Sequence, residues 1–265
     1  MNQPLTSKHR QHLLFTSNLA QESLITPRID FRNADCTLFL PKLPDASVDL
    51  VLIDPPYQIS DLRKRASGVF KDLRVRQNFG YWDSDHPSNQ SLDESIPELF
   101  RVLKPGGRLV CFYDVWKITT LRDMLDKAGF AQFRVIQWHK SSPVPINASR
   151  DILHNGIEYA ISCTKGSNAF FSRYMHTGIF EYGIVRNDVR IHPTQKPVEL
   201  LKELIRSFTH PGQTVLDCYA GSASTAVAAF QTGRHFVGCE RDWTHFQAAE
   251  KRIERCMQSP RDVYV

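Results

Sequence analysis

The chain reads Val48-Asp49-Leu50-Val51-Leu52-Ile53-Asp54-Pro55-Pro56-Tyr57 within its first quarter. Val, Leu and Ile in a short run that ends at prolines are typical of a buried strand in a parallel sheet. Two consecutive prolines prevent both further ladder hydrogen bonds and a helical turn, so the chain leaves the sheet rigidly after Asp54. A carboxylate, a proline carbonyl and an aromatic ring are thereby fixed side by side at a strand's carboxyl end, where open α/β sheets bind ligands. These groups suit a planar ligand that bears an amino group, although an ordinary strand exit would show the same residues.

A second strand-to-loop junction lies far down the chain, from Thr214 to Thr225. Apolar β-forming residues give way to small ones there, and an apolar helix follows. Small residues let the backbone approach a ligand closely, and a helix amino terminus attracts a carboxylate or phosphate. The loop lacks the full dinucleotide fingerprint, because Ala220 and Ala223 stand where further glycines are expected. The alternative is a tight turn without a ligand.

The strand predicted at 235–239 ends in Glu240. This is the place of the acidic residue that holds ribose hydroxyls in nucleoside-binding sheets. A helix-capping role is the alternative for an isolated acid at a strand end. The neighbouring loop favours the nucleoside interpretation.

With these residues in place, the chain resembles the β-arrangement amino-methyltransferases of DNA, which use S-adenosyl-L-methionine. Asp54 to Tyr57 looks like their catalytic motif IV, Asp217 to Thr225 like the methionine-binding motif I, and Glu240 like the motif II acid. The run His192-Pro193-Thr194-Gln195-Lys196-Pro197 is similar to motif X, which closes over the amino-acid end of the cofactor. The resemblance covers roughly residues 28–256, and the order of the motifs marks the β arrangement.

The resemblance implies roles for particular residues. The catalytic residues would be Asp54, Pro55, Pro56 and Tyr57, and the cofactor residues would be Asp35, Cys36, His192, Thr194, Lys196, Asp217, Tyr219, Gly221, Ser222, Ser224 and Glu240. The chain departs from the family pattern at Tyr219 and Ala223, where Phe and Gly are more usual. Tyr keeps the ring, and Ala is expected to add one methyl group beside the cofactor.

The implied activity is site-specific methylation of adenine N6 in double-stranded DNA, on a base that has left the duplex. Cytosine N4 is the chemically equivalent alternative, but family members that act on it usually carry Ser in place of Asp54. A methyltransferase for RNA or a protein amide would share the cofactor loop, and the permuted motif order argues against it. A non-catalytic DNA-binding module is the alternative from another class.

Basic residues that could contact DNA gather in two predicted inserts. The loop 58–91 follows motif IV, mixes its cations with aromatic residues, and can neutralise phosphates while stacking on bases; a solvated surface loop is the alternative. The segment 166–190 lies just before motif X, where the family has its target-recognition region. The predicted DNA contacts are Arg63, Lys64, Arg65, Lys71, Arg74, Arg76, Lys140, Arg173 and Arg186, although Lys140 could equally be an exposed lysine after a strand.

Alternating strand and helix patterns predict an α/β fold with a mainly parallel, doubly wound sheet, a circularly permuted version of the Rossmann-like methyltransferase fold. Since the functional loops must meet, the strands 48–54 and 214–218 should be neighbours. Residues 1–27 are predicted as a flexible or peripheral extension, 28–257 as the catalytic domain and 258–265 as a tail. Strands are expected near 28–34, 48–54, 108–113, 133–138, 158–164, 214–218 and 235–239, and helices near 92–103, 118–128, 198–209, 222–232 and 243–257.

Composition sets outer bounds. The net charge of +5 permits a polyanionic partner without requiring one. No apolar run approaches the length that spans a bilayer, and the amino terminus has no signal region, which predicts a cytoplasmic protein. Dispersed cysteines without a close pair predict reduced thiols and no metal site. Family members often form homodimers, but no heptad or apolar patch identifies an interface.

Overall fold

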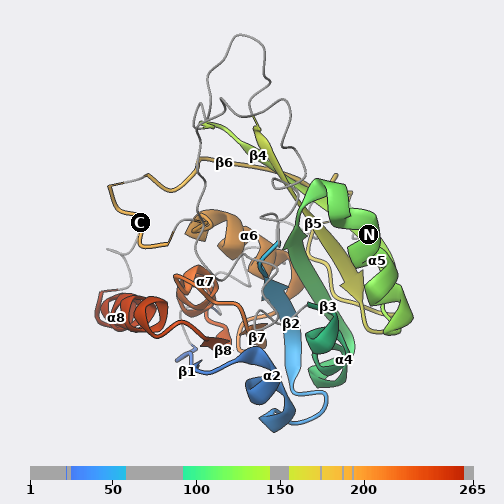
Figure 1. The fold of residues 1–265 in the computed structure, drawn as a ribbon, viewed down its shortest axis with the longest axis horizontal. Coiled ribbons are helices and arrows are strands. Elements are labelled where there is room, and N and C mark those ends of the chain that lie inside the picture. The colour runs from blue at the N-terminus through green and yellow to red at the C-terminus, as the bar shows by residue number, and fades with distance from the viewer. Residues whose placement is uncertain are drawn as a thin grey trace, which may run out of the picture.

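The computed structural model describes residue 22 and residues 25–57, 92–143, 155–173, 175–186, 188–192 and 194–259. These residues form a single eight-stranded sheet in the order β1-β8-β7-β2-β3-β5-β4-β6 (Figure 1). Among the described pairings, β5 runs antiparallel to its two neighbours and all others are parallel. The strands are β1 (Ile29–Asn33), β2 (Val48–Ile53), β3 (Leu103–Tyr113), β4 (Ala131–Lys140), β5 (Ile157–Thr164), β6 (Ile179–Tyr182), β7 (Thr214–Asp217) and β8 (His235–Glu240).

Helices cover both faces of the sheet. Leu50 and Leu52 on β2 pack with α6, α7 and α8, whereas Val51 and Ile53 pack with α2, α4 and α5. Alternate residues of a strand point to opposite faces, so an apolar run is buried on both sides. The predicted doubly wound sheet is confirmed. The helices are α2 (Cys36–Phe39), α4 (Leu92–Val102), α5 (Ile118–Lys127), α6 (Val198–Phe208), α7 (Ser224–Gln231) and α8 (Trp243–Gln258), with short 3₁₀ turns η1 (Leu40–Lys42) and η3 (Val115–Lys117).

The strands that carry the two functional loops are neighbours. β2 pairs in parallel with β7 through Leu50 with Val215 and Val51 with Leu216. Parallel neighbours end at the same edge of a sheet, so Asp54 and the loop after Asp217 leave the sheet together. The predicted adjacency of the early and the late strand is confirmed.

One strand was absent from the sequence prediction. β6 has four residues and pairs in parallel with β4, and the indole of Trp138 donates to the carbonyl of Tyr182 at 2.9 Å. It lies inside the segment 166–190 that was predicted as a recognition insert, so part of that segment belongs to the sheet. Buried and more exposed residues alternate along β6, but a strand of four residues is too short to give a distinct pattern in the sequence.

Glu22 is held in the domain by two arginines. The carboxylate of Glu22 contacts Arg206 at 2.8 Å and also binds Arg234, whose side chain is fully buried. Glu22 belongs to residues 1–27, which were predicted as a flexible or peripheral extension. The structure places its side chain inside, because two arginines from α6 and the α7–β8 turn need a carboxylate partner there.

Candidate active site

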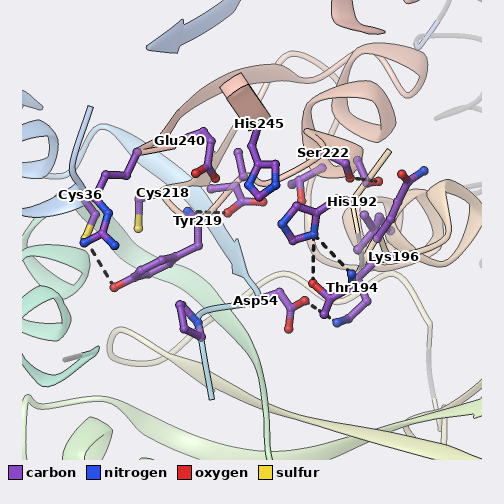
Figure 2. A pocket seen from close by; sticks show the side chains of 18 of the residues that line it. Cys36, Asp54, His192, Thr194, Lys196, Cys218, Tyr219, Ser222, Glu240 and His245 are labelled. Atoms are coloured by element: carbon purple, nitrogen blue, oxygen red, sulfur yellow. Dashed lines mark hydrogen bonds and ion pairs between the residues drawn. The ribbon is translucent and has the colours of Figure 1, made fainter. Parts of the chain in front are cut away.

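A cavity lies at the carboxyl edge of the sheet, among the residues that follow β2, β7 and β8. It holds about 930 Å³ of space that is continuous with solvent. Segments far apart in the sequence meet there (Figure 2). Its walls contain every predicted cofactor residue except Gly221, namely Asp35, Cys36, His192, Thr194, Lys196, Asp217, Tyr219, Ser222, Ser224 and Glu240.

Asp54 lies between two donors at the edge of this cavity. Tyr57 donates its hydroxyl to Oδ1 at 2.7 Å, and the ammonium of Lys196 donates to Oδ2 (Figure 2). Lys196 also lies 3.1 Å from Oε2 of Glu158, and Lys140 lies 2.8 Å from Oε1 of the same carboxylate. The four charged side chains thus form a row of alternating sign that begins at Asp54.

The charges of this row act on the pKa values of its members. Burial raises the pKa of Asp54 above its ordinary value and Glu158 adds to the rise, whereas the adjacent Lys196 opposes it. Burial also acts to lower the pKa of Lys196, but the carboxylates of Asp54 and Glu158 outweigh it and raise the pKa above its ordinary value. Lys196 therefore stays cationic, and its ion pair with Asp54 stabilises the carboxylate form of that side chain against the effect of burial.

The β7–α7 loop adopts a tight left-handed conformation. The φ angles of Gly221 and Ala223 are 51° and 55°. The backbone N–H of Gly221 donates to Oε2 of Glu240 at 2.8 Å, so the end of β8 holds this loop. The expected place of the Ala223 methyl group is wrong: the residue is fully buried in the core and does not line the cavity.

At one end of the cavity, three side chains meet beside the β1–α2 turn. The hydroxyl of Tyr219 lies 2.8 Å from Oγ of Ser95 and accepts from Sγ of Cys36 at 3.5 Å. Asp35 caps α2 by accepting from the backbone N–H of Thr37 at 3.0 Å. Tyr in place of the family's usual Phe therefore has a structural use here, because its hydroxyl joins β7's loop to α4 and α2.

At the other end, two histidine rings lie together. His192 packs edge-on against His245 with ring centroids 4.5 Å apart, and Thr194 contacts Nδ1 of His192 at 3.2 Å. Burial lowers the pKa of His192 to about 3, and the nearby His245 adds to this effect. His192 is therefore neutral at physiological pH. A Cβ at Gly221 would meet the His192 ring at 3.5 Å, an ordinary contact distance, so glycine is favoured there by its φ of 51° rather than by lack of space.

The predicted DNA contacts divide into three groups. Arg63, Lys64, Arg65, Lys71, Arg74 and Arg76 lie outside the described residues. Arg186 is 81% exposed and pairs with Asp188, whereas Arg173 is 33% exposed and pairs with Glu203. Lys140 is only 15% exposed and paired with Glu158. The alternative of an exposed lysine at 140 is wrong, and its role toward DNA stays a prediction.

Several residues of the cavity and its surroundings had no signal in the sequence. Glu158 is the second residue of β5, Ser95 lies in α4, and Arg241 and His245 follow Glu240 in the sequence. Each reaches the site only through strand order or helix packing. His245 and Arg241 could have been suspected from their closeness to Glu240 in the sequence.

The described residues show neither a metal-ligand cluster nor a membrane span. Over the part of the chain that the structure describes, no group of three or more His, Cys, Asp or Glu side chains is arranged to hold a metal ion. Within the same residues, no helix combines the length and apolar character needed to cross a membrane.

Asp217 gives the site a testable pH dependence. Burial raises its pKa to about 7 from 3.8, although Thr225 and the backbone N–H of Tyr219 donate hydrogen bonds to it. Between these two values the folded state holds one proton more than the unfolded state, so this group lowers the free energy of unfolding as pH rises. Asp217→Asn removes that dependence. Relative to the unmodified protein, its free energy of unfolding should rise by up to about 1.4 kcal/mol per pH unit across this window.

Urea unfolding at several pH values between about 4.5 and 6.5 measures this difference. The comparison with the unmodified protein cancels the other titrating groups. A difference that stays constant across the window would show that Asp217 is ionised in the folded state.

Comparisons with known proteins agree with this geometry. A family model described as DNA methylase matches residues 48–181 and 172–251. The chain is 30% identical to YubD of Escherichia coli (strain K12) over 231 residues, which is 86% of this chain and 92% of YubD. It is 28% identical to the type II methyltransferase M2.DpnII of Streptococcus pneumoniae over 240 residues, or 84% and 88% of the two chains. The crystal structure of the M1.HpyAVI–SAM complex superposes with a TM-score of 0.65 at 25% identity, covering 85% of this chain and 98% of that one.

Proposed function

The chain belongs to the N6/N4 DNA methylase family, and from this premise we propose that it is a site-specific adenine-N6 methyltransferase that uses S-adenosylmethionine. The observation that carries the proposal is the position of Asp54. Its carboxyl group, which accepts from the ammonium of Lys196, stands at the edge of the cavity that the predicted cofactor residues line. A carboxylate at this place accepts hydrogen bonds from an exocyclic amino group.

The donors and acceptors of the cavity fit S-adenosylmethionine. Asp35, which directly precedes Cys36, and Glu240 both bring carboxylates to the cavity, which suits the amino and hydroxyl hydrogens of an adenosine. Hydroxyls from Thr194, Ser222 and Ser224 also line the cavity, and Figure 2 shows Thr194 and Ser222 on the side away from Cys36; these hydroxyls suit the carboxylate of an amino acid. When bound, the cofactor supplies an electrophilic methyl group on its sulfonium.

The remaining chemistry falls to the chain's own residues. The adenine amino nitrogen is a weak nucleophile because its lone pair is delocalised into the ring, and the base must leave the duplex to reach the cavity. Asp54 and the carbonyl of Pro55 accept its two hydrogens, which makes the lone pair more available. Although Lys196 and Tyr57 already bond to Asp54, two carboxylate oxygens offer about four acceptor sites, so room remains.

Tyr57 holds the extruded base by stacking on it. Its ring packs edge-on against Tyr113 with centroids 5.6 Å apart, and Lys117 donates to its carbonyl oxygen at 2.9 Å. Both contacts fix the ring beside Asp54 before a base arrives. Positioning of this kind supplies much of the acceleration in a methyl transfer that needs no metal and no covalent step on the protein.

Nucleoside analysis tests the proposal. Unmodified duplex DNA is incubated with the protein and S-adenosylmethionine labelled in its methyl group, and the digested nucleosides are separated. We expect the label in N6-methyladenine. Label in N4-methylcytosine would support the cytosine alternative, and a folded protein that transfers no label to any DNA would reject the catalytic proposal.

Glu240 is proposed to hold the ribose hydroxyls. Its Oε2 and Oε1 already accept from the backbone N–H groups of Gly221 and Asp242, both at 2.8 Å, so the carboxylate is held rigidly at the cavity wall. Glu240→Ala should weaken S-adenosylmethionine binding by about tenfold or more, the scale of a charge-assisted hydrogen bond. Calorimetry measures the affinity and circular dichroism checks the fold. An unchanged affinity in a folded variant would refute the assignment.

The basic loop 58–91 is proposed to contact DNA phosphates. Replacing Arg63, Lys64 and Arg65 together by Ala should weaken DNA binding. The slope of the logarithm of the binding constant against the logarithm of the salt concentration should become shallower by roughly one unit for each phosphate that the protein no longer neutralises. Fluorescence anisotropy at several salt concentrations measures both. Affinity for S-adenosylmethionine should not change, and it serves as the control. An unchanged salt slope together with a loss of sequence preference would instead mean that these residues contact bases.

A further inference from the structure

A buried cation stands behind the loop that forms one wall of the cavity. Arg252 on α8 is 7% exposed, and its Nη1 lies 2.9 Å from both the carbonyl oxygen of Ser222 and Oγ of Ser224. A guanidinium Nη1 carries two hydrogens, so both are donated to the loop. Ser222 and Ser224 both line the cavity, and Figure 2 shows Ser222 at its wall.

The two serine hydroxyls leave one hydrogen for a ligand. Their oxygens lie 3.1 Å apart, so one hydroxyl donates to the other. The pair owns two hydroxyl hydrogens, and its internal bond uses one of them, whichever serine is the donor. Arg252 also occupies an acceptor site on Ser224. The pair is therefore biased to donate to a group in the cavity rather than to accept from one.

The charge of Arg252 favours the same kind of ligand. Burial lowers its pKa to about 10, which still leaves it cationic at neutral pH. Ser224 is also the first residue of α7, whose amino-terminal N–H groups carry a partial positive charge. A fixed cation, a helix amino terminus and a spare hydroxyl hydrogen all favour an anionic group at this wall.

We propose that Arg252 is a positioning residue that makes the Ser222–Ser224 pair a hydrogen-bond donor to the carboxylate at the amino-acid end of S-adenosylmethionine. The inference rests on the proposed function and deepens it. Arg252 acts through the two serines and does not touch the ligand. It explains why a charged side chain is buried beneath a loop of small residues.

Two ligands that differ only at the amino-acid end test the proposal. S-adenosylhomocysteine and 5′-methylthioadenosine are both thioethers without the sulfonium charge, and only the first carries the amino-acid group with its carboxylate and ammonium. Arg252→Met keeps the aliphatic stem but removes the charge and the donors. We expect it to weaken S-adenosylhomocysteine binding by about tenfold or more in calorimetry while the affinity for 5′-methylthioadenosine changes by less than about twofold.

Variants of the serines and of α8 complete the test. Ser224→Ala should likewise weaken S-adenosylhomocysteine binding more than 5′-methylthioadenosine binding. The double variant Arg252→Met/Ser224→Ala should lose no more affinity for S-adenosylhomocysteine than the more affected single variant, because both changes break the same chain of contacts. Ser224→Ala carries the test alone if Arg252→Met does not fold. Arg255→Met is the matched control, since Arg255 is exposed on the same helix and should leave both affinities unchanged.

Two results would overturn the proposal. An equal loss for both ligands in Arg252→Met and in Ser224→Ala would mean that these residues only support the loop, and no loss for either ligand would mean that they do not influence this wall. If the unmodified protein bound neither S-adenosylmethionine nor S-adenosylhomocysteine, the proposed function would fail, and this inference would fail with it.

Discussion

Asp54→Asn is expected to reduce methyl transfer by about 10³-fold while S-adenosylmethionine affinity stays largely unchanged. The substitution keeps the size of the side chain but replaces one acceptor oxygen by a donor and removes the charge. Removing a single preorganised polar group at a reacting centre costs about 10²–10³ in rate in general. Here the new amide hydrogens would also face Lys196, which donates to the same position.

Single-turnover assays with saturating DNA and cofactor measure the effect on the chemical step. Calorimetry with S-adenosylmethionine checks that the cavity persists. Tyr57→Phe is the matched comparison, because it keeps the stacking ring and removes only the hydroxyl that donates to Oδ1 of Asp54. We expect Tyr57→Phe to lose far less activity than Asp54→Asn. Equal activity in Asp54→Asn and the unmodified protein would remove Asp54 from the mechanism.

Glu22→Ala is expected to lower the free energy of unfolding by about 3 kcal/mol, the cost of breaking a buried ion pair at one partner. The carboxylate is the partner of Arg206 and of Arg234. Arg234 is fully buried, and burial lowers its pKa, so the loss of Glu22 leaves a charge that water cannot easily reach. The site lies at the amino-terminal edge of β8, away from the cavity.

Urea unfolding monitored by circular dichroism measures the loss. Asp123→Ala is the control, because Asp123 pairs with Arg122 at 3.0 Å on an exposed surface of α5 and such pairs contribute little. Activity of the folded fraction of Glu22→Ala should remain. A stability change as small as that of the control would show that Arg234 finds other partners when Glu22 is removed.

The sequence predicted the site well where chemistry follows a strand directly. Asp54 and Glu240 were placed at strand ends by local pattern, and both stand at the cavity. Lys196 was predicted as a cofactor residue because motif X contains it, and it does line the cavity. Its ammonium nevertheless binds Asp54 and Glu158, so its first effect is on the ionisation of the catalytic carboxylate.

The sequence alone determined the fold class and the longer helices and strands, but not the four-residue elements α2 and β6. Apolar runs, prolines and glycines act within a few residues, so strands such as β2 and the loop at Gly221 could be predicted from local pattern. Strand adjacency followed from one further condition, that two functional loops must meet. The resemblance to a known family then supplied the chemistry that the loops share.

Only the tertiary structure decided which charged side chains are partners. Lys196 and Asp54 are 142 positions apart, and Arg234 and Glu22 are 212 positions apart. Arg252 reaches Ser224 only because α8 packs against the β7–α7 loop. Such pairs have no local signature, because a buried charge takes whatever partner the packed helices and strands bring within hydrogen-bond distance, and that packing is fixed by the whole sheet.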